Sequence, residues 1–98
     1  MSKFSEIINK TVPVLVDFYA EWCGPCQVMT PVLKEVKDEL KDKVSIFKIN
    51  VDNNSQLARQ YHVRGVPTFI IFKEGKQLWR QSGIIEKNEL INIINKFS

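Results

Sequence analysis

Several features that would assign a class at once are missing from this chain. No apolar run approaches the roughly 18 residues that a membrane-spanning helix needs, so we expect no membrane role. The N-terminus meets Glu6 and has no apolar stretch before it, which argues against a secretory signal and predicts a cytoplasmic protein. Internal repeats and low-complexity tracts are also missing, so the 98 residues predict a single domain over residues 1–98.

Metal-ligating residues are scarce. The chain has one histidine, His62, and two cysteines, Cys23 and Cys26. A structural zinc site needs four ligands, and covalent haem attachment needs a histidine directly after the second cysteine, where Gln27 stands. Two thiols three positions apart also close too small a loop to be an effective structural staple. We therefore expect no bound metal and look for a chemical role for the cysteines.

The chain also has no large excess of charges of one sign. Fourteen basic and eleven acidic residues give a net charge of +3, and both signs alternate along residues 34–43, as on a solvated helix face. No basic stripe with interleaved aromatic residues is present, so we expect no nucleic-acid partner.

The apolar pattern that is present predicts helices alternating with strands, followed by a hairpin and a last helix. Residues 14–19 are almost continuously apolar, which is typical of a central strand covered on both faces. The order predicts an α/β/α sandwich around a mixed sheet. The expected helices cover residues 5–10, 25–40, a short segment capped at 53–55 and ending at 60, and 86–97; the expected strands cover 14–19, 44–51, 68–73 and 76–81.

The segment Trp22-Cys23-Gly24-Pro25-Cys26 lies where the central strand ends and a helix begins. A helix N-terminus stabilises a thiolate, which is the reactive form of cysteine. Cys23, just before the helix, is expected to be the exposed nucleophile with a lowered pKa, and Cys26, in the first turn, the more buried resolving thiol. Gly24 allows a partner backbone to approach, and Pro25 suits the first helical turn. This setting favours redox chemistry over two buried thiols that merely pack.

With these motifs the chain resembles the thioredoxin family. The matching segments are residues 16–26 (VDFYAEWCGPC), Pro31, Lys48, 50–52 (NVD), 63–68 (VRGVPT), 72–75 (FKEG) and Gly83. The likeness runs from about residue 12 to 97. Family members usually begin with an extra edge strand, and only 22 residues precede Cys23, so we expect a four-stranded sheet without a strand in residues 1–10. Tyr19 stands where many members have tryptophan, and Gln27 where many have lysine.

The resemblance implies further site residues. Asp17 lies inside the apolar strand, where an unpaired carboxylate is costly to bury; it is either a strand-end aspartate that points to water or a buried group with a raised pKa that pairs with Lys48 on the neighbouring strand. In the second case the resemblance implies that Asp17 accepts the proton of Cys26. Val66-Pro67 matches the family's cis-proline loop facing the cysteines, where the Val66 backbone could pair with an extended substrate. A shallow apolar groove around the nucleophile would be formed by Trp22, Gly24, Pro25, Val66, Pro67, Gly83 and Ile84.

The implied function is that of a general protein dithiol–disulfide oxidoreductase acting mainly as a reductant. A thioredoxin reductase would restore the dithiol, commonly with NADPH as the ultimate donor, and the protein would be a monomer whose only redox group is the Cys23–Cys26 disulfide. Two alternatives stay open. An oxidase or isomerase is the first, which the Gly24-Pro25 dipeptide disfavours because no histidine overstabilises the thiolate. The second is a thioredoxin-like binding module, which an intact cysteine pair disfavours.

Overall fold

The computed structural model describes residues 3–98, and its helices and strands follow the predicted order. The elements are α1 (Lys3–Ile7), β1 (Val14–Tyr19), α2 (Gly24–Leu40), the 3-10 turn η1 (Lys41–Lys43), β2 (Ser45–Asn50), α3 (Ser55–Gln60), β3 (Thr68–Lys73), β4 (Lys76–Ser82) and α4 (Lys87–Lys96). Within the described residues, no helix is both long enough and apolar enough to cross a bilayer.

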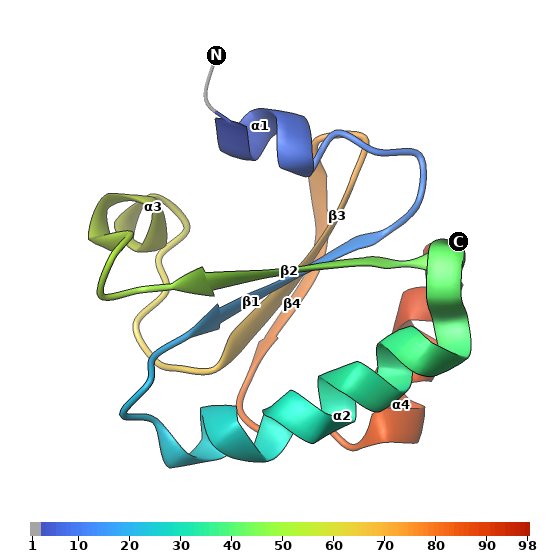
Figure 1. Ribbon diagram of the computed structural model, residues 1–98. Helices are drawn as coiled ribbons and strands as arrows, with labels where there is room; N and C mark the ends of the chain where they lie inside the picture. Colours follow the sequence, from blue (N-terminus) through green and yellow to red (C-terminus); the bar gives the residue numbers. More distant parts are fainter. Residues whose placement is uncertain (1–2) are drawn as a thin grey trace.

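A mixed sheet of four strands, in the order β2-β1-β3-β4, forms the centre of the molecule (Figure 1). β1 pairs parallel to β2, while β3 is antiparallel to both β1 and β4. The register places Asp17 of β1 opposite Lys48 of β2 on one side and opposite Phe69 of β3 on the other. The prediction of four strands is confirmed for residues 3–98, because residues 3–7 form α1; Met1 and Ser2 lie outside the described residues.

Two apolar cores cover the two faces of the sheet. α2 and α4 pack on one face, against side chains that include Leu15 and Phe69, and α1 and α3 flank the other, where Val16 and Phe18 are buried (Figure 1). Successive side chains of a strand point to opposite faces, so Leu15, Asp17 and Tyr19 share the face that α2 covers. β1 is therefore buried on both faces, as its apolar run predicts.

The first helix begins earlier than the sequence predicts, at Lys3 instead of Ser5, and ends before Ile8. Its C-terminal continuation pairs with the hairpin between β3 and β4: the N–H of Glu74 donates to the carbonyl of Lys10 (2.8 Å), and that of Gly75 to the carbonyl of Ile8 (3.1 Å). The prediction of a helix up to Lys10 is wrong because the carbonyl of Lys10 accepts from the hairpin turn and the chain there is no longer helical.

Candidate active site

The two cysteines lie at the start of α2, directly after the loop that leaves β1. Cys23 is the N-cap of the helix, with an extended backbone (φ −90°, ψ 112°), and its Sγ accepts a hydrogen bond from the backbone N–H of Cys26 at 3.1 Å. Pro25 occupies the first turn, where its missing N–H leaves no bond unmade. Cys23 and Cys26 are joined by a disulfide, with their Cα atoms 5.3 Å apart.

Both cysteines are buried in this disulfide form. Cys23 is 4% exposed and Cys26 is 5% exposed, so the prediction that Cys23 is exposed and Cys26 more buried is wrong here. A loop distant in sequence covers the N-cap sulfur, because Sγ of Cys23 lies 3.5 Å from the carbonyl oxygen of Val66. Cys26 instead lines a cleft between α2 and the ends of β1 and β2.

The covering loop contains a cis peptide bond between Val66 and Pro67, as the family resemblance implies. Two hydrogen bonds hold this loop. Thr68 Oγ1 donates to the carbonyl of Gly65 at 2.6 Å, and the N–H of Gly83 donates to the carbonyl of Pro67 at 2.9 Å. Gly83 has a φ of +95°, which favours glycine at that position. Val66, Pro67 and Gly83 are therefore brought together beside the cysteines.

Trp22, immediately before the nucleophile position, is 72% exposed but held in place. Its Nε1–H donates to Oδ2 of Asp52 at 2.9 Å. Sequence reasoning did not assign this role to Asp52. The signal was available: β1 and β2 are parallel, so the residues that follow their carboxyl ends meet at one edge of the sheet.

Asn50, the last residue of β2, builds the turn that presents Asp52. Its side-chain Oδ1 accepts from the N–H of Asp52 at 2.9 Å, and its carbonyl accepts from the side-chain amide of Asn54 at 3.0 Å. Asn54 is the N-cap of α3, but its side chain makes no capping bond, since it is used in this turn. The prediction that a residue among 53–55 caps this helix is confirmed for the position of Asn54, but the Asn54 side chain does not make the capping hydrogen bond.

Several of the predicted groove residues lie beside the disulfide: Trp22 precedes Cys23, Gly24 and Pro25 stand between the cysteines, and Val66 packs against them. Trp22 and Val66 line one small pocket of about 120 Å³ together with Val51, Val63, Arg64 and Gly65. Ile84 follows Gly83 and is 55% exposed. Gly24 and Pro25 are exposed at the start of α2. Large exposed apolar side chains next to a reactive centre are suited to contact a partner.

Asp17 is a carboxylate in the apolar interior, 1% exposed, and its Oδ1 has no hydrogen-bond partner in the described chain. Burial raises the pKa of Asp17 from 3.8 to about 6, because the charged form loses its hydration, and the positive charge of Lys48 opposes this rise. The sequence prediction of a buried carboxyl with a raised pKa agrees with this environment.

Lys48 lies opposite Asp17 in the sheet, but the two side chains form no ion pair within residues 3–98. The ammonium group instead lies over the ring of Tyr19, with Nζ 4.8 Å from the ring centroid. The neighbouring position of Lys48 is confirmed, and a direct pair with Asp17 is not formed, because the exposed lysine packs its charge on the aromatic face.

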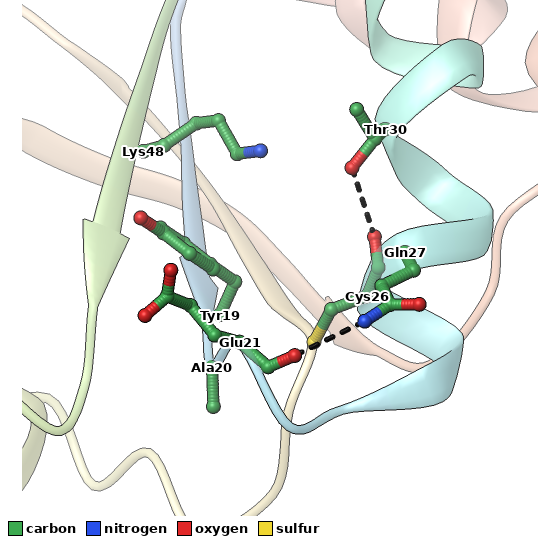
Figure 2. A pocket seen from close by; sticks show the side chains of 7 residues that line it. All are labelled: Tyr19, Ala20, Glu21, Cys26, Gln27, Thr30 and Lys48. Carbon is green, nitrogen blue, oxygen red and sulfur yellow. Dashed lines mark hydrogen bonds between the residues drawn. The ribbon is translucent and has the colours of Figure 1, made fainter.

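Tyr19, Lys48 and Cys26 line a cleft of about 250 Å³. Figure 2 shows Cys26 on one wall of it and Tyr19 and Lys48 on the other. Two hydrogen bonds order its rim. Gln27 Nε2 donates to the carbonyl of Glu21 at 3.1 Å, and Thr30 Oγ1 donates to the carbonyl of Cys26 at 3.4 Å. The cleft connects solvent with Cys26.

Among the described residues, no group of three histidine, cysteine, aspartate or glutamate side chains is placed to hold a metal ion. His62 lies exposed at the end of α3 with a φ of +55°. The group in this site that can exchange electrons is the cysteine pair itself.

Comparisons with known proteins agree with this geometry. The thioredoxin family model matches residues 1–96. A thioredoxin of Rickettsia felis is 45% identical over 91 residues, which span 93% of this chain and 87% of the relative. A chloroplastic thioredoxin Y of Oryza sativa is 48% identical over 94 residues, covering 95% of this chain and 56% of the relative. Among solved structures, a point mutant of a thioredoxin from Halobacterium salinarum superposes with a TM-score of 0.89 at 35% identity, covering 99% of this chain and 84% of that one.

Proposed function

Because this chain belongs to the thioredoxin family and is a thiol–disulfide oxidoreductase, we propose that it acts mainly as a general reductant of protein disulfides. The observation that carries the proposal is the Cys23–Cys26 disulfide at the start of α2, with the Cys23 sulfur accepting the N–H of Cys26. The same N–H and the helix N-terminus favour negative charge on that sulfur once the disulfide is reduced.

The first step is attack by the Cys23 thiolate on a substrate disulfide. A bond forms between Cys23 Sγ and one substrate sulfur while the substrate S–S bond breaks. The other substrate sulfur leaves as a thiolate and takes a proton from water. The Val66 carbonyl lies 3.5 Å from Cys23 Sγ in the disulfide form, which supports a substrate approach along the Val66–Pro67 loop.

The second step is attack by Cys26 on Sγ of Cys23, which re-forms the internal disulfide and releases the second substrate thiolate. Cys26 must lose its proton first. Asp17 is the proposed acceptor, because its side chain lies on the face of β1 that α2 covers and its pKa of about 6 suits a base at neutral pH.

Substrate docking is proposed for the exposed groove around the disulfide. Pro67 has no N–H, so the backbone of Val66 is the part of this loop suited to pair with an extended substrate strand. Trp22 and Ile84 offer apolar contact surface on the elements beside it. We further propose that the protein is a cytoplasmic monomer and that a thioredoxin reductase regenerates its dithiol.

The reduction potential tests the direction of electron flow. Thioredoxins that act as reductants have reduction potentials of about −270 mV, whereas a strongly oxidising thiol–disulfide protein has a reduction potential of about −120 mV. We expect this protein near the lower value, together with rapid reduction of insulin disulfides by the dithiol form. A potential near that of an oxidant would favour the oxidase alternative, and thiol-independent partner binding without insulin reduction would favour a binding module.

Single-turnover kinetics test the proposed acceptor. Asp17→Asn should leave the initial attack by Cys23 nearly unchanged and slow release of the mixed disulfide by about a hundredfold, the usual contribution of a general base. Release at the original rate would remove Asp17 from the mechanism.

A further inference from the structure

Tyr19 and Lys48 meet on the face of the sheet that also carries Asp17. Tyr19 is two positions beyond Asp17 on β1, so both side chains point to the α2 face. Lys48 is the cross-strand partner of Asp17 on β2 and shares that face. Nζ of Lys48 nevertheless lies 4.8 Å from the centroid of the Tyr19 ring, and Figure 2 shows the lysine extended above that ring.

Lys48 has two possible partners, the ring of Tyr19 and the carboxylate of Asp17. Oδ1 of Asp17 is buried and makes no hydrogen bond in the described chain, so it is an unsatisfied acceptor on the residue paired with Lys48 across the two strands. An ion pair there would require Lys48 to give up the water that its exposed position provides. The aromatic face attracts the ammonium group while leaving most of its hydration intact.

We propose that Tyr19 is a positioning residue whose ring holds the Lys48 ammonium group away from the Asp17 carboxylate, so that the carboxyl group stays buried without an ion pair. The consequence concerns basicity. An ammonium group in direct contact would favour the charged carboxylate and make it a weaker base. This inference rests on the proposed role of Asp17 only for its kinetic consequence.

Lys48 is the charged group whose position affects the pKa of Asp17. β3 presents Phe69 opposite Asp17. Burial raises the pKa of Asp17, and the charge of Lys48 opposes that rise. The titratable or charged groups that line the cleft on this side of the sheet are Tyr19 of β1, Glu21 of the following loop and Lys48 of β2. Cys26 of α2 also lines it but is held in the disulfide.

The first test is an NMR titration of the Asp17 carboxyl carbon in the oxidised protein. Tyr19→Leu keeps an apolar side chain but removes the aromatic face, and the freed Lys48 should pair with Asp17. We expect the Asp17 pKa to fall by about one pH unit, at the lower end of the effect of a contacting opposite charge. Tyr19→Phe keeps the ring and should titrate like the original protein. An unchanged or raised pKa in Tyr19→Leu would overturn the proposal.

Lys48→Met provides the matched background. If the ring acts through the lysine, Tyr19→Leu should not alter the Asp17 pKa once Lys48 is gone. An equal fall in both backgrounds would show that Tyr19 excludes water from Asp17 instead, and would also overturn the proposal.

A measurement on the unaltered protein covers the case in which Tyr19→Leu does not fold. The Lys48 ε-methylene protons should show the upfield ring-current shift of a group above an aromatic face, and Tyr19→Phe should retain it. Ordinary shifts for these protons would contradict the contact.

Kinetics then separate this inference from the proposed function. If both hold, the acid limb of the pH profile for mixed-disulfide release should move to lower pH in Tyr19→Leu by the same amount as the Asp17 pKa. If Asp17 is not the acceptor, Asp17→Asn fails its own test while the NMR titration still reports whether Tyr19 holds Lys48.

Discussion

A single buried carboxyl group links the proposed chemistry of this protein to its stability. Asp17 lies in the middle of β1 with 1% of its surface exposed, and its unpaired Oδ1 means that ionisation in the folded state is costly. The pKa of about 6 lies above the value of 3.8 for an unperturbed side chain. Between these two pH values the folded protein binds more protons at this position than the unfolded chain does.

The pH dependence of unfolding follows from this difference. The stabilisation from a raised carboxyl pKa is fully present below pH 3.8 and is lost as the pH rises through about 6. The shift corresponds to about 3 kcal/mol of unfolding free energy. Denaturant unfolding of oxidised Asp17→Asn should therefore show a variant more stable than the original at about pH 8, by up to that amount. Near about pH 4 the advantage should vanish, and an advantage that persisted there would assign the effect to something other than ionisation.

The cysteines have different expected roles despite their equal burial. Cys26→Ser should accumulate long-lived mixed disulfides with substrate, because the resolving thiol is missing, whereas Cys23→Ser should form none. Non-reducing electrophoresis after mixing with a disulfide-bonded substrate distinguishes the two variants. Covalent capture by Cys23→Ser through Cys26 would reverse the assignment of the nucleophile.

At the scale of elements, the β3–β4 hairpin depends on a two-residue turn. Glu74 and Gly75 have φ values of +53° and +82°, and positive φ at both central positions defines a type I′ turn. No atom lies within 4 Å of a Cβ added to Gly75, so conformation and not crowding decides the effect of a substitution.

Gly75→Ala should lower the free energy of unfolding by about 1 kcal/mol, because an L side chain disfavours the left-handed region. Gly65→Ala is the matched control. Its added Cβ also meets no atom within 4 Å, and its φ lies outside the positive region. We expect that control to be neutral or slightly stabilising, since alanine reduces the entropy of the unfolded chain. Equal losses in both variants would contradict the argument from φ.

At the scale of the whole molecule, redox state and stability are linked. A protein that reduces other disulfides must itself favour the disulfide form, so folding and the Cys23–Cys26 bond should support each other. The apolar cluster of Ala20, Cys23 and Cys26, covered by Tyr19, Val51 and Val66, is the packing that we expect to favour the closed form.

The oxidised protein should therefore unfold at a higher denaturant concentration than the reduced protein. For this two-electron couple, each lowering of the reduction potential by about 30 mV corresponds to about 1.4 kcal/mol of additional stability of the oxidised protein relative to the reduced protein. Parallel denaturant curves with and without reductant measure it. A more stable reduced form would indicate an oxidant, in which the dithiol is the favoured state.

Local patterns in the sequence determined most of the architecture. The apolar run of residues 14–19 predicted a central strand, and β1 does lie between β2 and β3 with both faces covered. The strand expected over residues 44–51 and the strand-to-helix position of the cysteines were predictable for the same reason: strand and helix periods are local properties. The acidic residue within that apolar run already marked Asp17 as a carboxyl with a raised pKa.

Contacts between distant segments were decided only by the tertiary structure. Val66 covers a sulfur 43 positions away, and Asp52 holds Trp22 across 30 positions. The ammonium group of Lys48 lies over the ring of Tyr19 and, within residues 3–98, forms no ion pair with Asp17, although the strand register places Lys48 opposite Asp17. Each of these outcomes depends on which groups remain hydrated when strands and loops pack together, and that balance is set by the three-dimensional arrangement and not by spacing along the chain.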